Sequence, residues 1–238
     1  MSLLEVKDID VHHGQLRALR SFSLTMNEGE TVAVIGANGA GKSTLLGALA
    51  GLVKPTSGSV TFDGNNVTRL PAYRRVSIGI ALVPEGRRLF KSLSVEENLK
   101  TGLYRGRSGP WNVQRVMELF EWMPERRNQN ASQLSGGEQQ AVAIGRALVG
   151  NPRLLLIDEL SLGLAPIIVK RIYGILPRIV EEGTSVLIVE QDVSQALRIA
   201  DRVHCLLEGH TVLEGAPTDF TQQQIESAYF GIGQAGEA

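Results

Sequence analysis

The feature that most constrains the fold is a glycine-rich segment, Gly36-Ala-Asn-Gly-Ala-Gly-Lys-Ser-Thr44, that lies between two regular patterns. The apolar, β-branched run Thr31–Ile35 precedes it and predicts a buried strand, and Lys42–Val53 follows and predicts a helix. The segment fits the pattern G-x-x-x-x-G-K-[S/T], which is meaningful only between a strand and a helix. The sequence therefore predicts a phosphate-binding loop at a helix N-terminus.

The residue types in this loop suit a nucleoside triphosphate. Glycines let backbone N–H groups surround phosphate oxygens, and the helix N-terminus adds partial positive charge. Lys42 can reach the β- and γ-phosphates, and the Ser43 hydroxyl can ligate Mg²⁺. A dinucleotide site is disfavoured because the glycine spacing is not G-x-G-x-x-G; a glycine-rich turn without a ligand is the alternative. The predicted ATP-binding residues are Gly36, Ala37, Asn38, Gly39, Ala40, Gly41, Lys42, Ser43 and Thr44.

Other apolar runs predict an α/β core. Leu154–Ile157 and Val186–Val189 are continuously apolar, which favours strands covered by helices on both faces of a parallel sheet. Residues 1–30 and 58–68 are short strand-like pieces separated by turn residues, and they predict a small antiparallel sheet. Residues 86–150 are mostly helical in pattern and predict an inserted helical subdomain.

Three local features add expectations about single residues: a capping box, a lone cysteine and the C-terminal tail. Ser94 and Glu97 have the spacing of a capping box at a helix start. Cys205 stands alone among apolar neighbours, so we expect a buried strand residue rather than a disulfide or metal ligand. The tail, Gly231–Ala238, is rich in Gly and Ala, and we expect it to fray.

Composition limits the partners and the compartment. The formal net charge is −1 and the pI is about 6.4, which does not favour nucleic acid as a partner. The first residues lack the apolar run of a signal peptide, and no run reaches the roughly 18–20 apolar residues that span a bilayer. We therefore expect a cytoplasmic protein that reaches the inner face of the membrane only through a partner.

Two further motifs carry chemistry. Leu154–Glu159 is an apolar strand ending in two carboxylates: Asp158 can hold Mg²⁺, and Glu159 can polarise an attacking water. A surface turn is the alternative for this pair. Leu134–Gln140 opens a helical pattern that runs through Gly150, and its Ser-Gly-Gly turn predicts a second anion-binding helix N-terminus, with a flexible turn as the alternative. One nucleotide does not need two such helix ends, and a dimer in which each chain covers the other's ATP would use both.

These three motifs, in this order, resemble those of ATP-binding cassette (ABC) proteins over essentially the whole chain. The resemblance implies a single nucleotide-binding domain over residues 1–238, with a P-loop NTPase core of ABC type, an antiparallel β subdomain and a helical subdomain at 86–150. It implies a head-to-tail dimer with ATP and Mg²⁺ at the interface. Each ATP would be held by one chain's phosphate loop and by the partner's signature residues, which here are Ser135, Gly136, Gly137 and Glu138.

Smaller motifs resemble one subgroup, the F-type ATP-binding subunit of branched-chain (hydrophobic) amino acid importers, with urea and amide importers close by. These motifs are Val83–Arg88, Leu93–Leu99, Ala143–Ala147, Ser161–Pro166 and Val189–Gln191. The resemblance implies an ATPase that drives transport, with two membrane-spanning permease subunits, a second cassette subunit (a sister chain or another copy), and a periplasmic substrate-binding protein that acts indirectly. We expect Gly86–Arg105 to be the docking surface for the permease. A soluble cassette ATPase of translation or DNA repair, or a regulatory subunit with little turnover, is the alternative.

Several positions depart from the general cassette pattern. Glu85 replaces a glutamine that contacts Mg²⁺, and a carboxylate can also ligate the metal; a solvated loop residue is the alternative. Gln191 replaces a histidine that contacts the γ-phosphate, and an amide can donate to phosphate without titrating. Leu160 replaces a proline, which we expect to loosen the turn after Glu159 while activity survives.

Two more positions differ from the usual pattern. Leu164 lies where many cassettes have an aspartate. His13 lies where an aromatic residue usually stacks on adenine, and an imidazole is a smaller stacking surface. An exposed histidine without a ligand is the alternative for His13. The implied catalytic residues are Lys42, Glu159 and Gln191, and the implied metal ligands are Ser43, Glu85 and Asp158.

Overall fold

A computed structural model of the chain describes residues 2–232, and these form two compact units. Of the described residues, those up to 71 and from 187 onward form unit 1, and residues 72–186 form unit 2. No helix of the described residues is long and apolar enough to cross a membrane. Each unit is described in turn.

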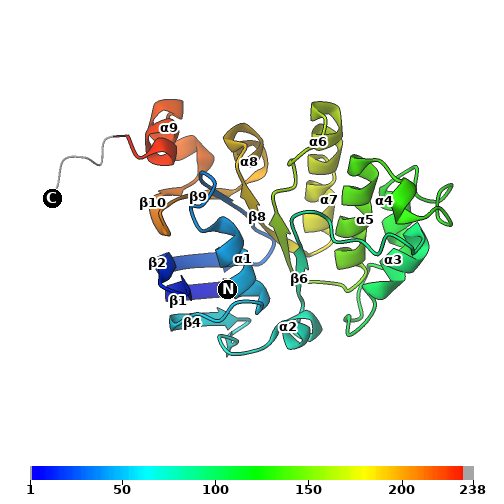
Figure 1. Ribbon diagram of the computed structural model, residues 1–238, viewed down its shortest axis with the longest axis horizontal. Coiled ribbons are helices and arrows are strands. Elements are labelled where there is room, and N and C mark those ends of the chain that lie inside the picture. The colour runs from blue at the N-terminus through cyan, green and yellow to red at the C-terminus, as the bar shows by residue number, and fades with distance from the viewer. Residues whose placement is uncertain (1, 233–238) are drawn as a thin grey trace. The chain divides into compact units, whose positions relative to one another are not determined.

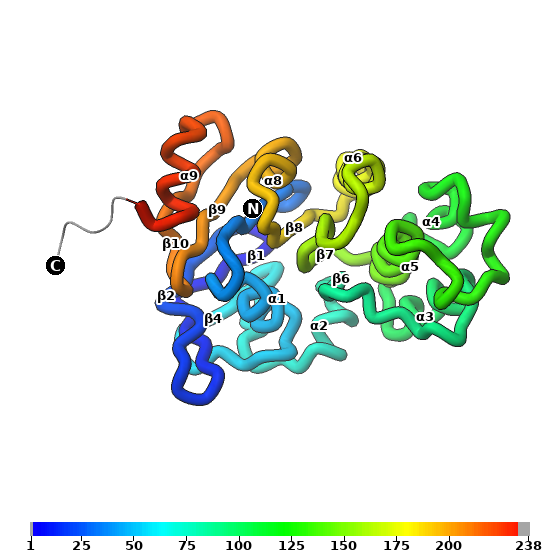
Figure 2. Tube along the Cα trace, turned by 45° about the horizontal axis from the view of Figure 1, so that its top comes forward, coloured from blue at the N-terminus to red at the C-terminus, as the bar shows by residue number. Residues whose placement is uncertain are grey.

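The N-terminal part of unit 1 is a four-stranded antiparallel sheet. Its strands are β1 (Ser2–His13), β2 (Leu16–Asn27), β4 (Ser57–Phe62) and β5 (Asn65–Asn66), in the order β2-β1-β4-β5. Figures 1 and 2 show β2, β1 and β4 side by side. Side chains alternate along β1, where Leu4, Val6, Ile9 and Val11 are buried. This sheet confirms the antiparallel strands that the pattern of residues 1–30 and 58–68 predicts.

The second sheet of unit 1 carries the phosphate loop. It contains β3 (Thr31–Ile35), β9 (Arg202–Leu207), β10 (His210–Gly215) and the unit-1 part of β8 (Ser185–Glu190), in the order β10-β9-β3-β8. β3 runs parallel to β9, and every residue of β3 is buried, as its apolar run predicts. Cys205 is fully buried in β9 and burial raises the pKa of its thiol to about 11, which confirms its expected place.

Four helical elements complete unit 1: α1 (Lys42–Ala50), α8 (Val193–Ile199), the short 3₁₀ helix η2 (Pro217–Asp219) and α9 (Gln222–Phe230). The predicted end of the first helix at Val53 is wrong. Gly51 adopts φ 76°, and the N–H groups of Leu52 and Val53 both turn back to the Gly47 carbonyl, so the helix closes in a left-handed glycine cap. Of the tail predicted to fray, 233–238 lie outside the described residues, and Gly231 caps α9 with φ 67°.

Unit 2 pairs two parallel strands, β6 (Ile80–Val83) and β7 (Leu154–Asp158), with helices. The helices are α2 (Ala72–Ile78), α3 (Val95–Thr101), α4 (Val113–Leu119), the 3₁₀ helix η1 (Ala131–Gln133), α5 (Gly136–Leu148), α6 (Pro166–Tyr173) and α7 (Leu176–Glu181). The regular elements between residues 86 and 150 are α3, α4, η1 and α5, so this stretch is helical (Figure 1). α5 ends at Leu148, two residues before its predicted end at Gly150.

The capping box at the start of α3 is confirmed. The Ser94 N–H donates to Glu97 Oε2 at 2.8 Å, and the Glu97 N–H donates to Ser94 Oγ at 3.2 Å. The fully buried Asn98 then accepts from the Phe90 N–H and donates to the Phe90 carbonyl, both at 3.0 Å. These bonds hold the chain between residues 90 and 98 in one conformation.

Candidate nucleotide-binding site

The phosphate loop follows β3 and its glycines are required by close contacts and by backbone angles. A methyl group on Gly36 would lie 2.4 Å from the Leu206 carbonyl oxygen, and one on Gly41 would lie 2.5 Å from the Ala18 carbonyl oxygen. Gly39 has open space around it but has φ 83°, which favours glycine. The loop is thus held against neighbouring strands with its backbone in a conformation that other residues rarely adopt.

Lys42 supplies a cation inside this loop. Its side chain is 4% exposed, and Nζ donates to the carbonyl oxygens of Gly36 at 2.8 Å and Ala37 at 3.2 Å. The N-cap residue of α1 is Gly41, which has no side chain to cap the helix, and the first turn of α1 carries no acidic residue. The helix N-terminus and the ammonium group therefore both favour an anion at this loop.

His13 lies beside the same helix. Its Nε2 is 3.1 Å from the Thr44 hydroxyl oxygen in the first turn of α1, and its cross-strand neighbour is Leu16, which is 67% exposed. The β1–β2 hairpin thus brings the imidazole and an exposed apolar side chain to the helix that begins at the phosphate loop. His12 is bonded elsewhere, with Nδ1 2.9 Å from the Thr56 hydroxyl oxygen.

Gln191 follows β8, which neighbours β3 in the sheet. Its side chain is exposed and lines a cavity of about 660 Å³ between α8 and α9, together with apolar residues such as Leu197 and Ile225. Glu190, directly before it, is 1% exposed. The sensing residue expected from the sequence therefore lies at the rim of a cavity formed by the C-terminal helix.

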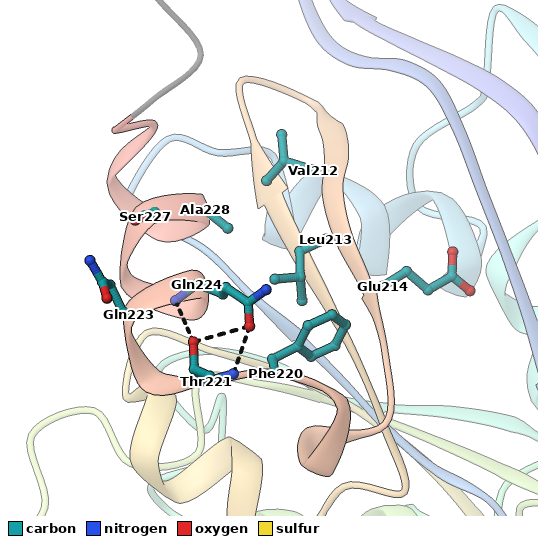
Figure 3. Close-up of a pocket in the computed structure, with 9 residues that line it drawn as sticks. All are labelled: Val212, Leu213, Glu214, Phe220, Thr221, Gln223, Gln224, Ser227 and Ala228. Atoms are coloured by element: carbon teal, nitrogen blue, oxygen red, sulfur yellow. Dashed lines mark hydrogen bonds between the residues drawn. The ribbon is translucent and has the colours of Figure 1, made fainter.

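The C-terminal helix is fixed by its own cap and by β10. Figure 3 shows Thr221 and Gln224 joined in a capping box: the Thr221 N–H donates to Gln224 Oε1 at 2.8 Å, and the Gln224 N–H donates to Thr221 Oγ1 at 3.3 Å. In the same view, Leu213 and Glu214 point to opposite sides of β10, as alternation along a strand requires. Glu214 Oε1 is 3.5 Å from Nε2 of the fully buried His204 on β9.

His204 is a buried base that the motifs do not explain. Neither ring nitrogen has a hydrogen-bond partner among the described residues. Burial lowers its pKa to about 4, and the charge of Arg202 acts in the same direction. The imidazole is therefore neutral at neutral pH.

In unit 2, β7 delivers the two carboxylates. All five residues of the strand are buried, Asp158 at its end is 8% exposed, and the half-buried Glu159 follows with φ 45°. A non-glycine residue in this left-handed region is uncommon and is enriched at functional sites. The side chain of Leu160 is completely buried, so an apolar anchor follows Glu159 where the general pattern has proline.

The signature turn is the N-terminus of α5. Ser135 Oγ accepts from the Glu138 N–H at 3.4 Å, and Glu138 Oε2 accepts from the Ser135 N–H at 2.8 Å, which makes a capping box. The other Glu138 oxygen is held by Arg126 Nη1 at 2.6 Å. A methyl group on Gly137 would lie 2.3 Å from Ile168 Cγ2 on α6, so close packing requires that glycine.

Glu85 is exposed and begins a loop whose shape the sequence does not show. The next three residues, Gly86, Arg87 and Arg88, all have positive φ. Arg146 of α5 fixes this loop: Nη2 donates to the Arg87 carbonyl at 3.0 Å and Nη1 to the Arg88 carbonyl at 2.8 Å.

Sequence reasoning missed Arg126 and Arg146, because each acts on atoms distant along the chain. Arg126 binds the carboxylate of Glu138, and Arg146 binds carbonyl groups 58 and 59 residues before it. No spacing rule links such partners, so only the packing of α5 reveals them.

Comparison with known proteins agrees with these motifs. The family model of the ABC transporter matches residues 19–161, more than half of the chain. The chain is 44% identical over 232 residues to the high-affinity branched-chain amino acid transport ATP-binding protein BraG of Pseudomonas aeruginosa, covering 96% of this chain and all of BraG. It is 33% identical to the lipopolysaccharide export system ATP-binding protein LptB of Escherichia coli, covering 97% of this chain and 98% of LptB.

Solved structures give the same fold. An ATP-binding cassette of an ABC transporter in its ADP conformation has a TM-score of 0.83 and 26% identity, covering 97% of this chain and 99% of that one. A dimeric cassette in a post-hydrolysis state, bound to ADP and Pi, has a TM-score of 0.80 and 28% identity, covering 90% of this chain and 98% of that one. The chain belongs to the ATP-binding cassette family of ABC transporters, and the predicted fold class is confirmed.

Proposed function

We propose that this chain is the ATP-binding and ATP-hydrolysing subunit of an ABC importer that energises uptake of branched-chain or other hydrophobic amino acids. The observation that carries the proposal is the 44% identity to BraG, which extends over the whole of that protein. The phosphate loop supports the nucleotide part, because its buried lysine and the helix N-terminus that begins at Gly41 both favour phosphate. We propose that the whole chain, 1–238, acts as a single nucleotide-binding domain with residues 86–150 as its helical subdomain.

The phosphate loop, residues 36–44, would bind the phosphates of ATP, and His13 would contact the adenine. The Thr44 hydroxyl that neighbours His13 belongs to the same loop, which supports this assignment. Among the described residues, no group of three or more His, Cys, Asp or Glu side chains could hold a metal. Mg²⁺ is usually held by one or two carboxylates together with phosphate oxygens. Ser43, Glu85 and Asp158 would hold it, and when bound it would neutralise phosphate charge.

Three residues would take part in hydrolysis. Glu159 would accept a hydrogen bond from the attacking water, and Lys42 would stabilise charge on the β- and γ-phosphates. Gln191 would donate its amide N–H to the γ-phosphate and thereby report whether that phosphate is present. An amide does not titrate near neutral pH, so this contact would persist where a histidine's would change.

The second half of each ATP site would come from a second cassette, either a sister chain or another copy of this one. The signature residues Ser135, Gly136, Gly137 and Glu138 would form this chain's contribution to the partner's nucleotide site. The dimeric cassette bound to ADP and Pi supports this arrangement. In this chain, Glu138 would act through the capping box, since its carboxylate is held by Arg126 and the Ser135 N–H.

The permease subunits would dock on the segment Gly86–Arg105, which would keep the chain at the inner face of the membrane. Three large apolar side chains of this segment are exposed: Phe90 at 53%, Leu103 at 49% and Tyr104 at 72%. Phe90 and Tyr104 also line a groove of about 390 Å³ with Val76 and Leu82. Such exposed apolar surface is typical of an interaction site. Two membrane-spanning subunits and a periplasmic binding protein would then bind and transport the cargo, which the cassette itself would not contact.

The Glu159→Gln variant tests the enzymatic part of the proposal. Loss of the carboxylate removes the group that orients water, so we expect ATP hydrolysis to fall by roughly 100-fold or more while ATP remains bound and the dimer persists. Size-exclusion chromatography with ATP and a phosphate-release assay measure both effects. Glu208→Gln is the matched control, because Glu208 is an exposed glutamate that shares the positive φ of Glu159, at 47°. Unchanged hydrolysis in Glu159→Gln would remove Glu159 from its assigned role.

Uptake by cells tests the cargo. A deletion of the gene should abolish accumulation of labelled leucine, isoleucine or valine, and the wild-type gene should restore it while Lys42→Ala should not. Loss of urea or amide uptake instead would assign the chain to that branch of importers. If every uptake rate is unchanged and the chain co-purifies with no polytopic membrane protein, the transport role is wrong and a soluble cassette ATPase remains.

A further inference from the structure

The loop after Glu85 carries an arginine that reaches the signature turn. Its backbone is fixed to α5, since Arg146 of that helix holds the Arg87 and Arg88 carbonyls. The side chain of Arg87 lies at the other end of the same helix. A methyl group on Gly136, the first residue of α5, would lie 3.3 Å from Arg87 Nη2 and 3.5 Å from Nη1. The guanidinium is therefore packed against the N-terminal turn of α5.

This guanidinium has no acceptor of its own. The side chain of Arg87 is half-buried, and it forms no hydrogen bond or ion pair with any residue that the structure describes. The carboxylate of Glu138, the one acidic residue in the first turn of α5, is already held by the Ser135 N–H and by Arg126. A guanidinium and a helix N-terminus are both positive, so their proximity costs free energy unless an anion lies against both.

We propose that Arg87 is a further nucleotide-contacting residue, a cation of the signature site that binds the terminal phosphate of the ATP held by the partner cassette. The inference rests on the proposed function, in which Ser135–Gly137 contact that nucleotide. The phosphate loop brings Lys42 to one side of the phosphates, and Arg87 would bring a second charge from the opposite chain. A planar guanidinium can donate two parallel hydrogen bonds to phosphate oxygens, which a lysine cannot.

The position of Arg87 also couples the loop that carries Glu85 to the signature turn. It follows Glu85, the proposed Mg²⁺ ligand, by two residues, and its carbonyl is held by the signature helix. Closure of the dimer on ATP would therefore fix the Glu85 loop and the signature turn together. A methyl group on Gly136 would also lie 3.3 Å from Leu164 Cδ2, so Leu164 and Arg87 are neighbours. A leucine side chain offers the guanidinium no hydrogen-bond acceptor.

The first test compares Arg87→Ala with Arg88→Ala, each introduced into this chain and assayed in the complex that it forms with its second cassette subunit. Arg88 is the matched control, because it is exposed, belongs to the same turn and has its carbonyl held by the same arginine. Removing a charge-assisted hydrogen bond to phosphate lowers a rate by roughly 10- to 100-fold, so we expect kcat of Arg87→Ala to fall by that factor. Binding of a fluorescent ATP analogue to the separate chain should change less than twofold, because that binding uses the phosphate loop. Arg87→Lys should recover part of kcat.

A mutant cycle with Leu164→Asp separates contact with phosphate from a structural role. An aspartate beside Arg87 would neutralise the guanidinium, so Leu164→Asp should lower kcat as Arg87→Ala does. In the Arg87→Ala background it should cause no further loss. If Arg87→Ala and wild type agree within twofold, or if Arg88→Ala loses as much activity, the inference is overturned.

A Ser135→Arg variant shows whether such a failure would extend to the signature site itself. Loss of ATP-dependent dimerisation in Ser135→Arg, with normal Arg87→Ala, would leave the signature site standing and reject Arg87 alone. Normal behaviour in both variants would reject the trans site as well.

Discussion

The phosphate loop and the signature turn both place glycines at the start of a helix, but they are built in different ways. In the phosphate loop, Gly39 and Gly41 have φ 83° and 108°, and Gly41, the N-cap residue of α1, has no side chain to cap the helix. In the signature turn, neither glycine has positive φ, and Ser135 caps α5 by accepting from the Glu138 N–H. One helix end is open to a ligand, and the other already satisfies part of its own backbone.

The two helix starts also differ in the charged side chains that lie at them. Lys42 is 4% exposed and lies within the loop, while the first turn of α5 has a carboxylate, Glu138, that serves the cap and pairs with Arg126. The comparison teaches that the phosphate loop brings together both features that favour an anion, a buried ammonium group and a helix N-terminus. The signature turn offers only two glycine N–H groups at N1 and N2 and needs a charge from elsewhere. Arg87 is the cation that the structure puts beside it.

The largest expected effect tests the ammonium group of the loop. Lys42→Ala removes the buried ammonium, so within the loop the phosphate charge would lose its one cationic side chain and keep the backbone N–H groups. Removing one preorganised donor of this kind lowers kcat by about 100- to 1,000-fold. A phosphate-release assay measures it, and Lys54→Ala, an exposed lysine of the same unit, is the control. Because Lys42 also binds two carbonyl groups, thermal unfolding of both variants must be compared. A well-folded Lys42→Ala with normal turnover would show that the loop does not depend on its lysine.

The next effect distinguishes the two glycines of the signature turn. Gly137→Ala would force a methyl group to within 2.3 Å of Ile168 Cγ2, whereas Gly136→Ala would meet only Arg87 and Leu164 side-chain ends at 3.3 Å. Ile168 is β-branched and stiff in its helix, so we expect Gly137→Ala to be less stable than Gly136→Ala by about 1–3 kcal/mol. Urea unfolding measures the difference in stability between the two variants. Both gain similar helix propensity from alanine, so that gain cancels in the difference. Ile168→Leu, which removes Cγ2, should recover the loss; equal stability of the two glycine variants would contradict the packing argument.

The sequence predicts most of the phosphate loop because its cause is local. Thr31–Ile35 is one uninterrupted apolar run, and the glycines and lysine follow at fixed spacing, so the strand and loop can be identified without any tertiary contact. The capping box of Ser94 and Glu97 is local as well, and it is present. Helix ends are harder, since α1 stops at Gly51 although apolar residues continue to Val53.

The signature turn is only half predictable from sequence. The Ser-Gly-Gly pattern indicates a helix start, but the need for Gly137 comes from Ile168, which lies 31 residues later. The positive φ of Arg87 and Arg88 has no signal in residue type, and two of the hydrogen bonds that hold the turn come from Arg146, which is distant along the chain. The burial of Leu160 also has no local signal: its side chain is fully buried, and its effect on the turn after Glu159 stays a prediction.

A smaller effect concerns the strand beneath the phosphate loop. His204 of β9 lies opposite Val34 of β3, and burial lowers its pKa to about 4, while an unfolded histidine has a pKa near 6.5. As pH falls from 6.5 toward 4, the unfolded chain takes up a proton that the folded chain does not, so stability falls by about 1.4 kcal/mol per pH unit from this group. Glu214, 3.5 Å away, and Arg202 are the charged groups that face it.

Urea unfolding at several pH values between 7 and 5 measures this slope. His204→Leu should lose it, and His210→Leu, on the neighbouring strand, should keep it. All four histidines lie outside residues 72–186, so amide exchange should rise in β3 and β9 at pH 5 before it rises in β6 and β7. An unchanged slope in His204→Leu would mean that the imidazole is protonated in the folded state.

The smallest expected effect tests whether the phosphate-loop unit senses the γ-phosphate without a titrating group. Gln191 is exposed after β8, and its amide can donate a hydrogen bond at any pH near neutrality. Gln191→His should therefore gain a pH dependence of kcat centred near 6.5, with a change of roughly tenfold or less, since a histidine donates differently in its two protonation states. Wild type and Gln191→Ala should lack this transition, because neither has a group at that position that takes up a proton. If wild type showed a one-proton loss of activity near pH 6.5 that disappeared in Gln191→Ala, Gln191 would be coupled to a titrating neighbour, and the phosphate loop would depend on a charge outside itself, as the signature turn does.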